Sequence, residues 1–144
     1  MTITQEQRAA RDTWVEALES GQFAQCQKRL FDGVGYCCLG VAEVSLGHTF
    51  ETRSYLDCDC PSCTGDSPDY VVSGTRESVV LTRLAQARLG FASNDPWLWV
   101  LPEGIPEPVS LAILNDAHGY TFEQIARVIR AQPEDWDGTH RDPK

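Results

Sequence analysis

Three cysteines that stand close together, Cys58, Cys60 and Cys63, carry the strongest chemical signal in this sequence. Zinc takes four ligands in a tetrahedron, and thiolates are common among them. Cys60 and Cys63 have the Cys-x-x-Cys spacing that places two sulfurs on one ion, and Cys58 offers a third. The sequence therefore predicts one structural zinc ion. Its fourth ligand would come from His48, Cys26, Cys37 or Cys38.

Other interpretations of these cysteines stay open. A second Cys-x-x-Cys pair, which would strengthen the zinc prediction, is absent from the sequence. The segment could be a loop of reduced thiols, or a redox pair without the βαβ context in which such pairs usually occur. A catalytic zinc ion is less favoured, because the neighbouring Asp57, Asp59 and Asp66 are typical of a solvated loop.

Cys37 and Cys38 stand where a ribbon is expected to meet the start of a helix. A helix N-terminus lowers the pKa of a thiol, which prepares cysteine as a nucleophile. A cysteine-dependent hydrolase centred on Cys38 would use His118 as its base and Asn115 or Asp116 to orient that base. The simpler interpretation, which we favour, is that both cysteines are small core residues. We therefore expect no catalysis.

Asn115 and Asp116 are candidate ligand-binding residues in a polar turn between two expected helices. Asp116 could contact a ligand or act as a base. The alternative is structural, since Asn and Asp side chains in turns bind free main-chain groups. We favour this structural alternative, with His118 as a turn residue.

Trp97 and Trp99 are candidates for binding a small planar ligand. They alternate along an extended segment, so both indoles face one side, and aromatic faces stack on nucleobases. Such a segment more often covers a core. No Gly-rich phosphate-binding loop occurs, although scattered arginines could hold phosphates on such a ligand. These are Arg29, Arg53, Arg76 and Arg83.

The net charge of −9 in 144 residues limits the partners. Binding to duplex DNA depends on Lys and Arg, so we expect no direct contact with nucleic acid. An acidic surface favours solubility, or it complements a basic surface on another protein. We expect no membrane segment, because no apolar run approaches the roughly 18 residues that a spanning helix takes. The first residues lack the features of a signal peptide, which predicts a cytoplasmic protein with reduced cysteines.

Periodicity and capping signals predict four or five short helices. Capping boxes start two of them, at Thr4 with Gln7 and at Thr121 with Gln124. The first helix ends before Gly21 and the last before Pro133. The others are expected at about 38–46, 77–89 and 109–117.

The fold class that follows is α+β and mainly α, with a small β-ribbon or sheet. We expect a ribbon of residues 28–31 against 34–37 and a short strand at 70–73. Residues 48–76 form a Cys-rich excursion. A single domain covers 1–132, and 133–144 are expected to be a loose C-terminal tail.

Three motifs occur in order: WVEAL at 14–18, CCLGV at 37–41, and an LND…G.TF..IA pattern at 114–126. Together they resemble an uncharacterised family of small phage and prophage proteins, especially from actinobacteria. The resemblance covers 11–42 and 81–130, without the Cys-rich excursion. It implies a phage context, in which small acidic proteins often counter host defence.

These observations leave three hypotheses. The first is a non-catalytic, phage-derived binding protein in the cytoplasm of the bacterial host. It would counter an antiviral system by sequestering a small ligand or by occupying a host protein. The second is a cysteine-dependent hydrolase built on Cys38, Asp116 and His118. The third is a zinc-stabilised structural module that assembles with another phage protein or with itself as a homo-oligomer.

Overall fold

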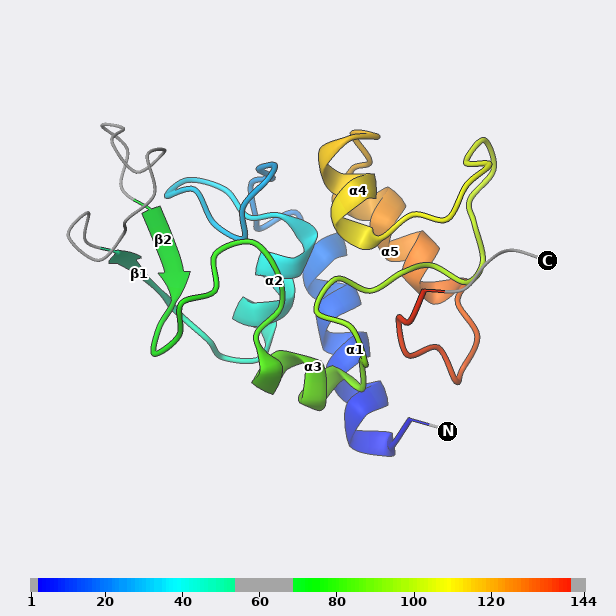
Figure 1. Ribbon diagram of the computed structural model, residues 1–144, viewed down its shortest axis with the longest axis horizontal. Helices are drawn as coiled ribbons and strands as arrows, with labels where there is room; N and C mark the ends of the chain where they lie inside the picture. Colours follow the sequence, from blue (N-terminus) through cyan, green and yellow to red (C-terminus); the bar gives the residue numbers. More distant parts are fainter. Residues whose placement is uncertain (1–2, 54–68, 141–144) are drawn as a thin grey trace.

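The computed structural model describes residues 3–53 and 69–140 of the chain. Within these ranges it has five helices and one antiparallel pair of strands (Figure 1). In chain order the elements are α1 (Gln5–Glu19), α2 (Cys38–Ser45), β1 (Phe50–Arg53), β2 (Asp69–Val72), α3 (Arg83–Leu89), α4 (Leu111–Asp116) and α5 (Phe122–Arg130). The predicted class, α+β and mainly helical, is confirmed. No helix in these two ranges is long and apolar enough to cross a membrane.

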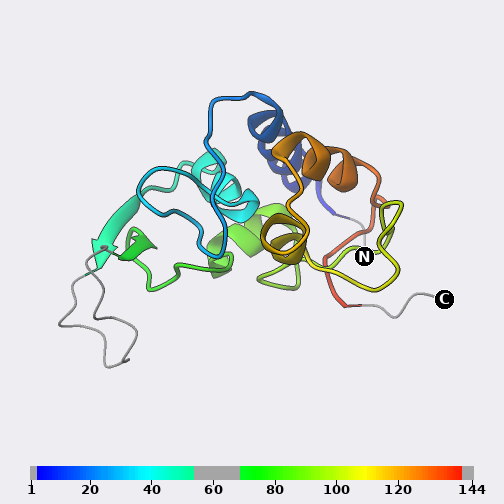
Figure 2. The same ribbon diagram turned by 90° about the horizontal axis from the view of Figure 1, so that it is seen from above.

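Helix α1 packs against α2, α3 and α5 and so joins the parts of the helical core. Figure 1 shows the β1–β2 hairpin at one end of the molecule and α5 toward the other. In the view from above, α1 and α5 lie side by side (Figure 2). Trp14 of α1 is fully buried, and its indole Nε1 donates to the Cys38 carbonyl at 2.9 Å. This bond fixes the start of α2 against α1.

Both capping boxes expected from the sequence are formed. The Thr4 hydroxyl accepts from the Gln7 N–H at 3.1 Å, and the Gln7 side chain accepts from the Thr4 N–H at 2.9 Å. Thr121 and Gln124 repeat the arrangement at the start of α5. Each box satisfies two main-chain N–H groups that lack a partner within the helix. These two starts therefore follow from local sequence.

The ribbon expected from residues 28–31 and 34–37 does not form as two strands. The loop makes only isolated bridges, in which Tyr36 pairs with Gln25 and with Phe31. Lys28 has a left-handed backbone (φ 70°), which regular strands do not contain. The Leu30 N–H donates to the Ser78 carbonyl at 2.8 Å instead of across a ribbon. A distant main-chain partner therefore replaces part of the expected pairing.

The strand expected at 70–73 is present as β2, and its partner β1 is an element that the sequence analysis missed. The two strands pair with Phe50 opposite Val72 and Arg53 opposite Asp69. The Phe50 ring lies 5.3 Å from the ring of Phe31, measured between centroids. Aromatic contacts of this kind tie the hairpin to the loop that precedes α2.

Helix α3 begins later than expected, at Arg83 rather than near residue 77. The Leu81 N–H donates to the Asn94 carbonyl at 2.9 Å, and Thr82 serves as the N-cap of α3. These bonds hold the segment before Arg83 in a non-helical path. Leu84, expected on the apolar stripe of this helix, is 59% exposed.

Residues 133–140 do not form the loose tail expected of them. Trp136 is 1% exposed, and its Nε1 donates to the Trp97 carbonyl at 2.7 Å. The Arg11 guanidinium lies over the rings of Phe91, at 4.3 Å, and Trp136, at 5.3 Å. The sequence of this segment is mostly polar, but Trp136 provides a large apolar surface whose burial holds the segment against the core. Residues 141–144 lie outside the described ranges.

A test of the packing around α2 concerns Gly40. A Cβ on this residue would lie 1.9 Å from the Leu30 carbonyl oxygen, so neighbouring main chain would have to move. We expect Gly40→Ala to lower the free energy of unfolding by about 3 kcal/mol or more, as overpacking does. Urea unfolding followed by circular dichroism measures this change.

Gly21→Ala is the matched control for Gly40→Ala. Gly21 has a left-handed backbone (φ 73°), and a Cβ on this residue would have no other atom within 4 Å. We expect the change to cost only about 1 kcal/mol, the conformational penalty of an L-residue there. Equal costs for the two variants would contradict the close approach of Leu30 to α2.

Candidate functional site

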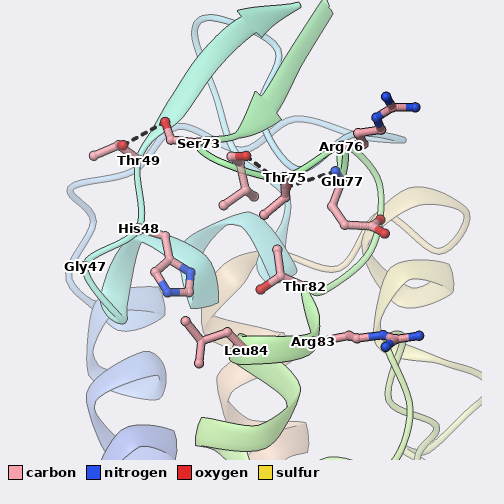
Figure 3. A pocket seen from close by; sticks show the side chains of 11 residues that line it. Gly47, His48, Thr49, Ser73, Thr75, Arg76, Glu77, Thr82, Arg83 and Leu84 are labelled. Carbon is pink, nitrogen blue, oxygen red and sulfur yellow. Dashed lines mark hydrogen bonds between the residues drawn. The ribbon is translucent and has the colours of Figure 1, made fainter.

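A cavity of about 550 Å³ opens between the end of α2, the base of the β1–β2 hairpin and the start of α3 (Figure 3). This volume is within the range of small-molecule sites. Its wall combines hydroxyl, apolar and charged side chains. The lining residues of this kind are His48, Thr49, Val72, Ser73, Thr75, Arg76, Glu77, Thr82, Arg83 and Leu84.

A fully buried carboxylate supports the cavity from the core side. Glu43 is 0% exposed, and its Oε1 accepts from the Thr82 N–H at 2.8 Å. Its Oε2 accepts from the Thr82 hydroxyl at 3.3 Å and contacts Nδ1 of His48 at 2.6 Å. An unpartnered carboxylate would be costly here, so these contacts are what allow Glu43 to be buried.

The end of α2 explains how His48 reaches back to Glu43. The Gly47 N–H donates to the Val44 carbonyl at 2.9 Å, and the His48 N–H donates to the Glu43 carbonyl at 3.1 Å. Gly47 has φ 88°, so these bonds form a Schellman motif with glycine at the left-handed position. This turn reverses the chain and carries the His48 side chain over the last turn of α2.

The pairing with Glu43 decides which nitrogen of His48 remains for a ligand. Nδ1 is engaged by the buried carboxylate, so Nε2 is the ring nitrogen that remains for a ligand, and His48 is one of the residues that line the cavity. A carboxylate partner of this kind fixes the orientation and the tautomer of an imidazole. In the neutral ring, Nδ1 donates to Glu43 and Nε2 accepts a hydrogen bond. Figure 3 shows His48, Thr82 and Leu84 close together on this wall.

The predicted residues Asn115 and Asp116 do come together with the start of α2. Asn115 is fully buried, and its Oδ1 accepts from the Gln25 side chain at 2.9 Å and from the Cys38 N–H at 3.3 Å. Its Nδ2 donates to the Cys26 carbonyl and to Asp116 Oδ1, both at 2.9 Å. Every polar atom of Asn115 is therefore used within the fold, as its structural interpretation predicts.

Cys38 has the environment of a core residue. It is fully buried, and its thiol donates to the Leu111 carbonyl at 3.6 Å. Burial raises the pKa of the Cys38 thiol well above its ordinary range, so the reactive thiolate is disfavoured. The proposed base, His118, is exposed, and Asp116 accepts from the Lys28 N–H at 2.8 Å. The structure therefore does not assemble Cys38, His118 and Asp116 as a catalytic group.

Trp97 and Trp99 are covered by the C-terminal segment of the same chain. The Trp97 ring lies 4.7 Å from the ring of His140 in an edge-on contact. The Trp99 Nε1 donates to the Thr139 carbonyl at 2.9 Å. Both indoles are half-buried. Both indoles are thus partly engaged in contacts within the chain.

The predicted zinc ligands Cys58, Cys60 and Cys63 lie outside the described residues, so the zinc ion stays a prediction. His48 is described, and its Nδ1 is engaged by Glu43. Across residues 3–53 and 69–140, no group of three or more His, Cys, Asp or Glu side chains is placed to hold a metal ion.

Glu43 is not among the predicted site residues, although the sequence carries a signal for it. Glu43 is the only charged residue in the run Cys38–Ser45, where Leu39, Val41 and Val44 are apolar. A single carboxylate in a buried helix requires hydrogen-bond partners, because an unpaired buried charge is costly, and His48 lies only five residues further along the chain. The distant partner, Thr82, had no signal in the sequence.

Comparisons with known proteins identify one family. The model of a family described as "Domain of unknown function (DUF8296)" matches residues 6–133. Neither the curated proteins nor the solved structures give a significant match.

The buried carboxylate has a direct test. Glu43→Ala removes the partner of His48 and of the Thr82 N–H, and we expect it to lower the free energy of unfolding by about 3–5 kcal/mol. Glu16→Ala, an exposed acid on α1, is the control and should change it by less than about 0.5 kcal/mol. Urea midpoints of the two variants that coincide would contradict the role given to Glu43.

A second prediction concerns Cys37, whose thiol accepts from the Gly40 N–H at 3.4 Å. Burial raises the pKa of this thiol to about 12 in the folded chain. Above pH 8.5 an unfolded chain releases this proton and the folded chain retains it, so stability falls as pH rises toward 12. We expect Cys37 to account for about 2 kcal/mol of that loss between pH 7 and pH 10.

Cys37→Ser isolates this contribution, because serine also caps a helix and has no thiol to titrate. The loss of unfolding free energy from pH 7 to pH 10, measured in urea, should be smaller in the variant than in the unmodified chain. If the two chains lose the same amount, Cys37 is not protected from ionisation by the fold.

Proposed function

This chain belongs to the family described as a domain of unknown function (DUF8296), and from its own geometry we propose that it binds a small ligand in the cavity beside His48, without catalytic turnover. One observation carries the proposal. A fully buried Glu43 engages Nδ1 of the cavity-lining His48, which holds the ring in place and leaves Nε2 for a ligand.

The composition of the cavity supports binding. A small-molecule site usually combines apolar surface with a few polar groups in fixed positions. Val72 and Leu84 supply apolar surface here, and His48 is held by Glu43. Fixed polar groups favour affinity, because little side-chain entropy is lost when the ligand binds.

The cysteine-dependent hydrolase receives less support from the same geometry. Cys38 is fully buried with a raised thiol pKa, and His118 is exposed. Planar-ligand binding at Trp97 and Trp99 is also less supported, because residues 139 and 140 contact both indoles.

The biological setting of the proposal comes from the sequence resemblance to phage and prophage proteins. In that setting, binding without turnover would sequester a small molecule on which a bacterial antiviral system depends. The net charge of −9 supports a related role, in which the acidic surface occupies a basic surface on a host protein. The cavity favours the first of these roles.

The proposal is tested with phenol as a small polar aromatic probe. Titration into the ¹⁵N-labelled full chain should shift the amide resonances of residues 47–49, 73–77 and 82–84 in NMR spectra. Leu84→Trp adds bulk at the cavity and should abolish these shifts. Leu84 is 59% exposed, so the change should leave the fold intact.

Val100→Trp is the matched control for Leu84→Trp. Val100 is a 45% exposed apolar residue that does not line the cavity, so the phenol shifts should persist in this variant. Phenol shifts that appear only at the indole resonances of Trp97 and Trp99 would contradict the proposal. Such shifts would instead place the ligand at Trp97 and Trp99, the candidate residues that the sequence indicates.

A further inference from the structure

Two arginines beside the cavity make no pair with an acid among the residues that the structure describes. Arg76 and Arg83 both line it, and neither guanidinium makes an ion pair or hydrogen bond with any other residue in ranges 3–53 and 69–140. Other arginines do have partners: Arg130 pairs with Glu19, and Arg88 donates to the Leu46 carbonyl. Within the described ranges, the two cavity arginines therefore keep their donors for a ligand.

Among the described residues that line the cavity, arginines outnumber acids, although the chain as a whole is acidic. The described lining holds one acid, Glu77, and two arginines, whereas the chain as a whole carries −9. The buried Glu43 is already occupied by His48 and Thr82. Figure 3 shows the side chains of Arg76, Glu77 and Arg83 on one side of the cavity, away from His48. Cations gathered at one cavity of an acidic protein favour an anionic ligand locally.

The opposite wall has a different character. Leu84 is 59% exposed there and offers apolar surface, and Figure 3 places it next to His48. Val72 adds apolar surface to the lining. A ligand that fits both walls has a charged end and an uncharged, partly apolar end.

We propose that the ligand is a small molecule with a phosphate-type oxyanion, which binds Arg76 and Arg83, and an uncharged body, which packs on Leu84 beside His48. The proposal rests on the proposed function and adds the chemical class of the ligand. Guanidinium groups suit this role, because their planar N–H donors match the oxygens of phosphates and carboxylates. His48 Nε2 then hydrogen-bonds a polar group on the body.

The experiment compares phenyl phosphate with phenol, which share the body and differ in the oxyanion. Both are titrated into the ¹⁵N-labelled full chain and into the double variant Arg76→Gln/Arg83→Gln. Phenyl phosphate should bind the unmodified chain at least tenfold more tightly than phenol. The double variant should lose that advantage and keep its affinity for phenol.

Arg127→Gln is the matched control, since Arg127 is an exposed arginine of α5 that does not line the cavity. It removes one positive charge, against two in the double variant, and should leave the affinity for phenyl phosphate within about twofold. Raising the salt concentration should weaken the binding of phenyl phosphate and leave the binding of phenol unchanged, because salt screens the attraction between exposed charges.

The remaining outcomes separate the two proposals. In one outcome, phenol binds in the cavity and phenyl phosphate binds no more tightly; in another, the double variant still binds phenyl phosphate more tightly than phenol. Either result contradicts the proposal that the ligand carries an oxyanion and leaves the proposed binding site in place. If neither compound shifts the resonances of the cavity residues, both proposals fail. Well-dispersed amide spectra of the double variant confirm that it is folded, so its affinities can be compared.

Discussion

The Glu43 carboxylate has to find hydrogen-bond partners at the centre of an apolar helix, and separate segments of the chain meet to provide them. The Schellman turn after α2 brings His48, and the residue before α3 brings the N–H and hydroxyl of Thr82. The same contacts bring one wall of the cavity together. The contacts that allow Glu43 to be buried therefore also position the residues of the candidate site.

The parts of the fold that the sequence predicted well are those that depend on neighbouring residues. The helix starts at Thr4 and Thr121 each require a hydroxyl and a glutamine three residues apart. The late start of α3 depends instead on distant partners: Asn94, which accepts from the Leu81 N–H, and Glu43, which lies 39 residues before Thr82. Strand β1 likewise forms through its pairing with β2. Periodicity within one segment carries no information on such distant partners.

The candidate site shows the same division. Asn115 and Asp116 were recognised as a polar pair, and they do meet the start of α2, where they connect main-chain groups. Residue type alone does not distinguish a polar group that binds a ligand from one that satisfies the fold. The cavity beside His48 could not be predicted from the sequence, because its lining comes from three separate segments, 47–49, 72–77 and 82–84.

Helix α1 depends in part on residues that the ribosome adds more than a hundred residues later. Arg130 of α5 pairs with Glu19 across 111 residues, and Arg11 stacks on Trp136. Until these residues emerge, the apolar face of α1, with Val15 and its neighbours, has no complete cover. During translation, Glu19 of α1 therefore precedes its partner in α5 by 111 residues, and contacts between residues so far apart in the chain are expected to slow folding.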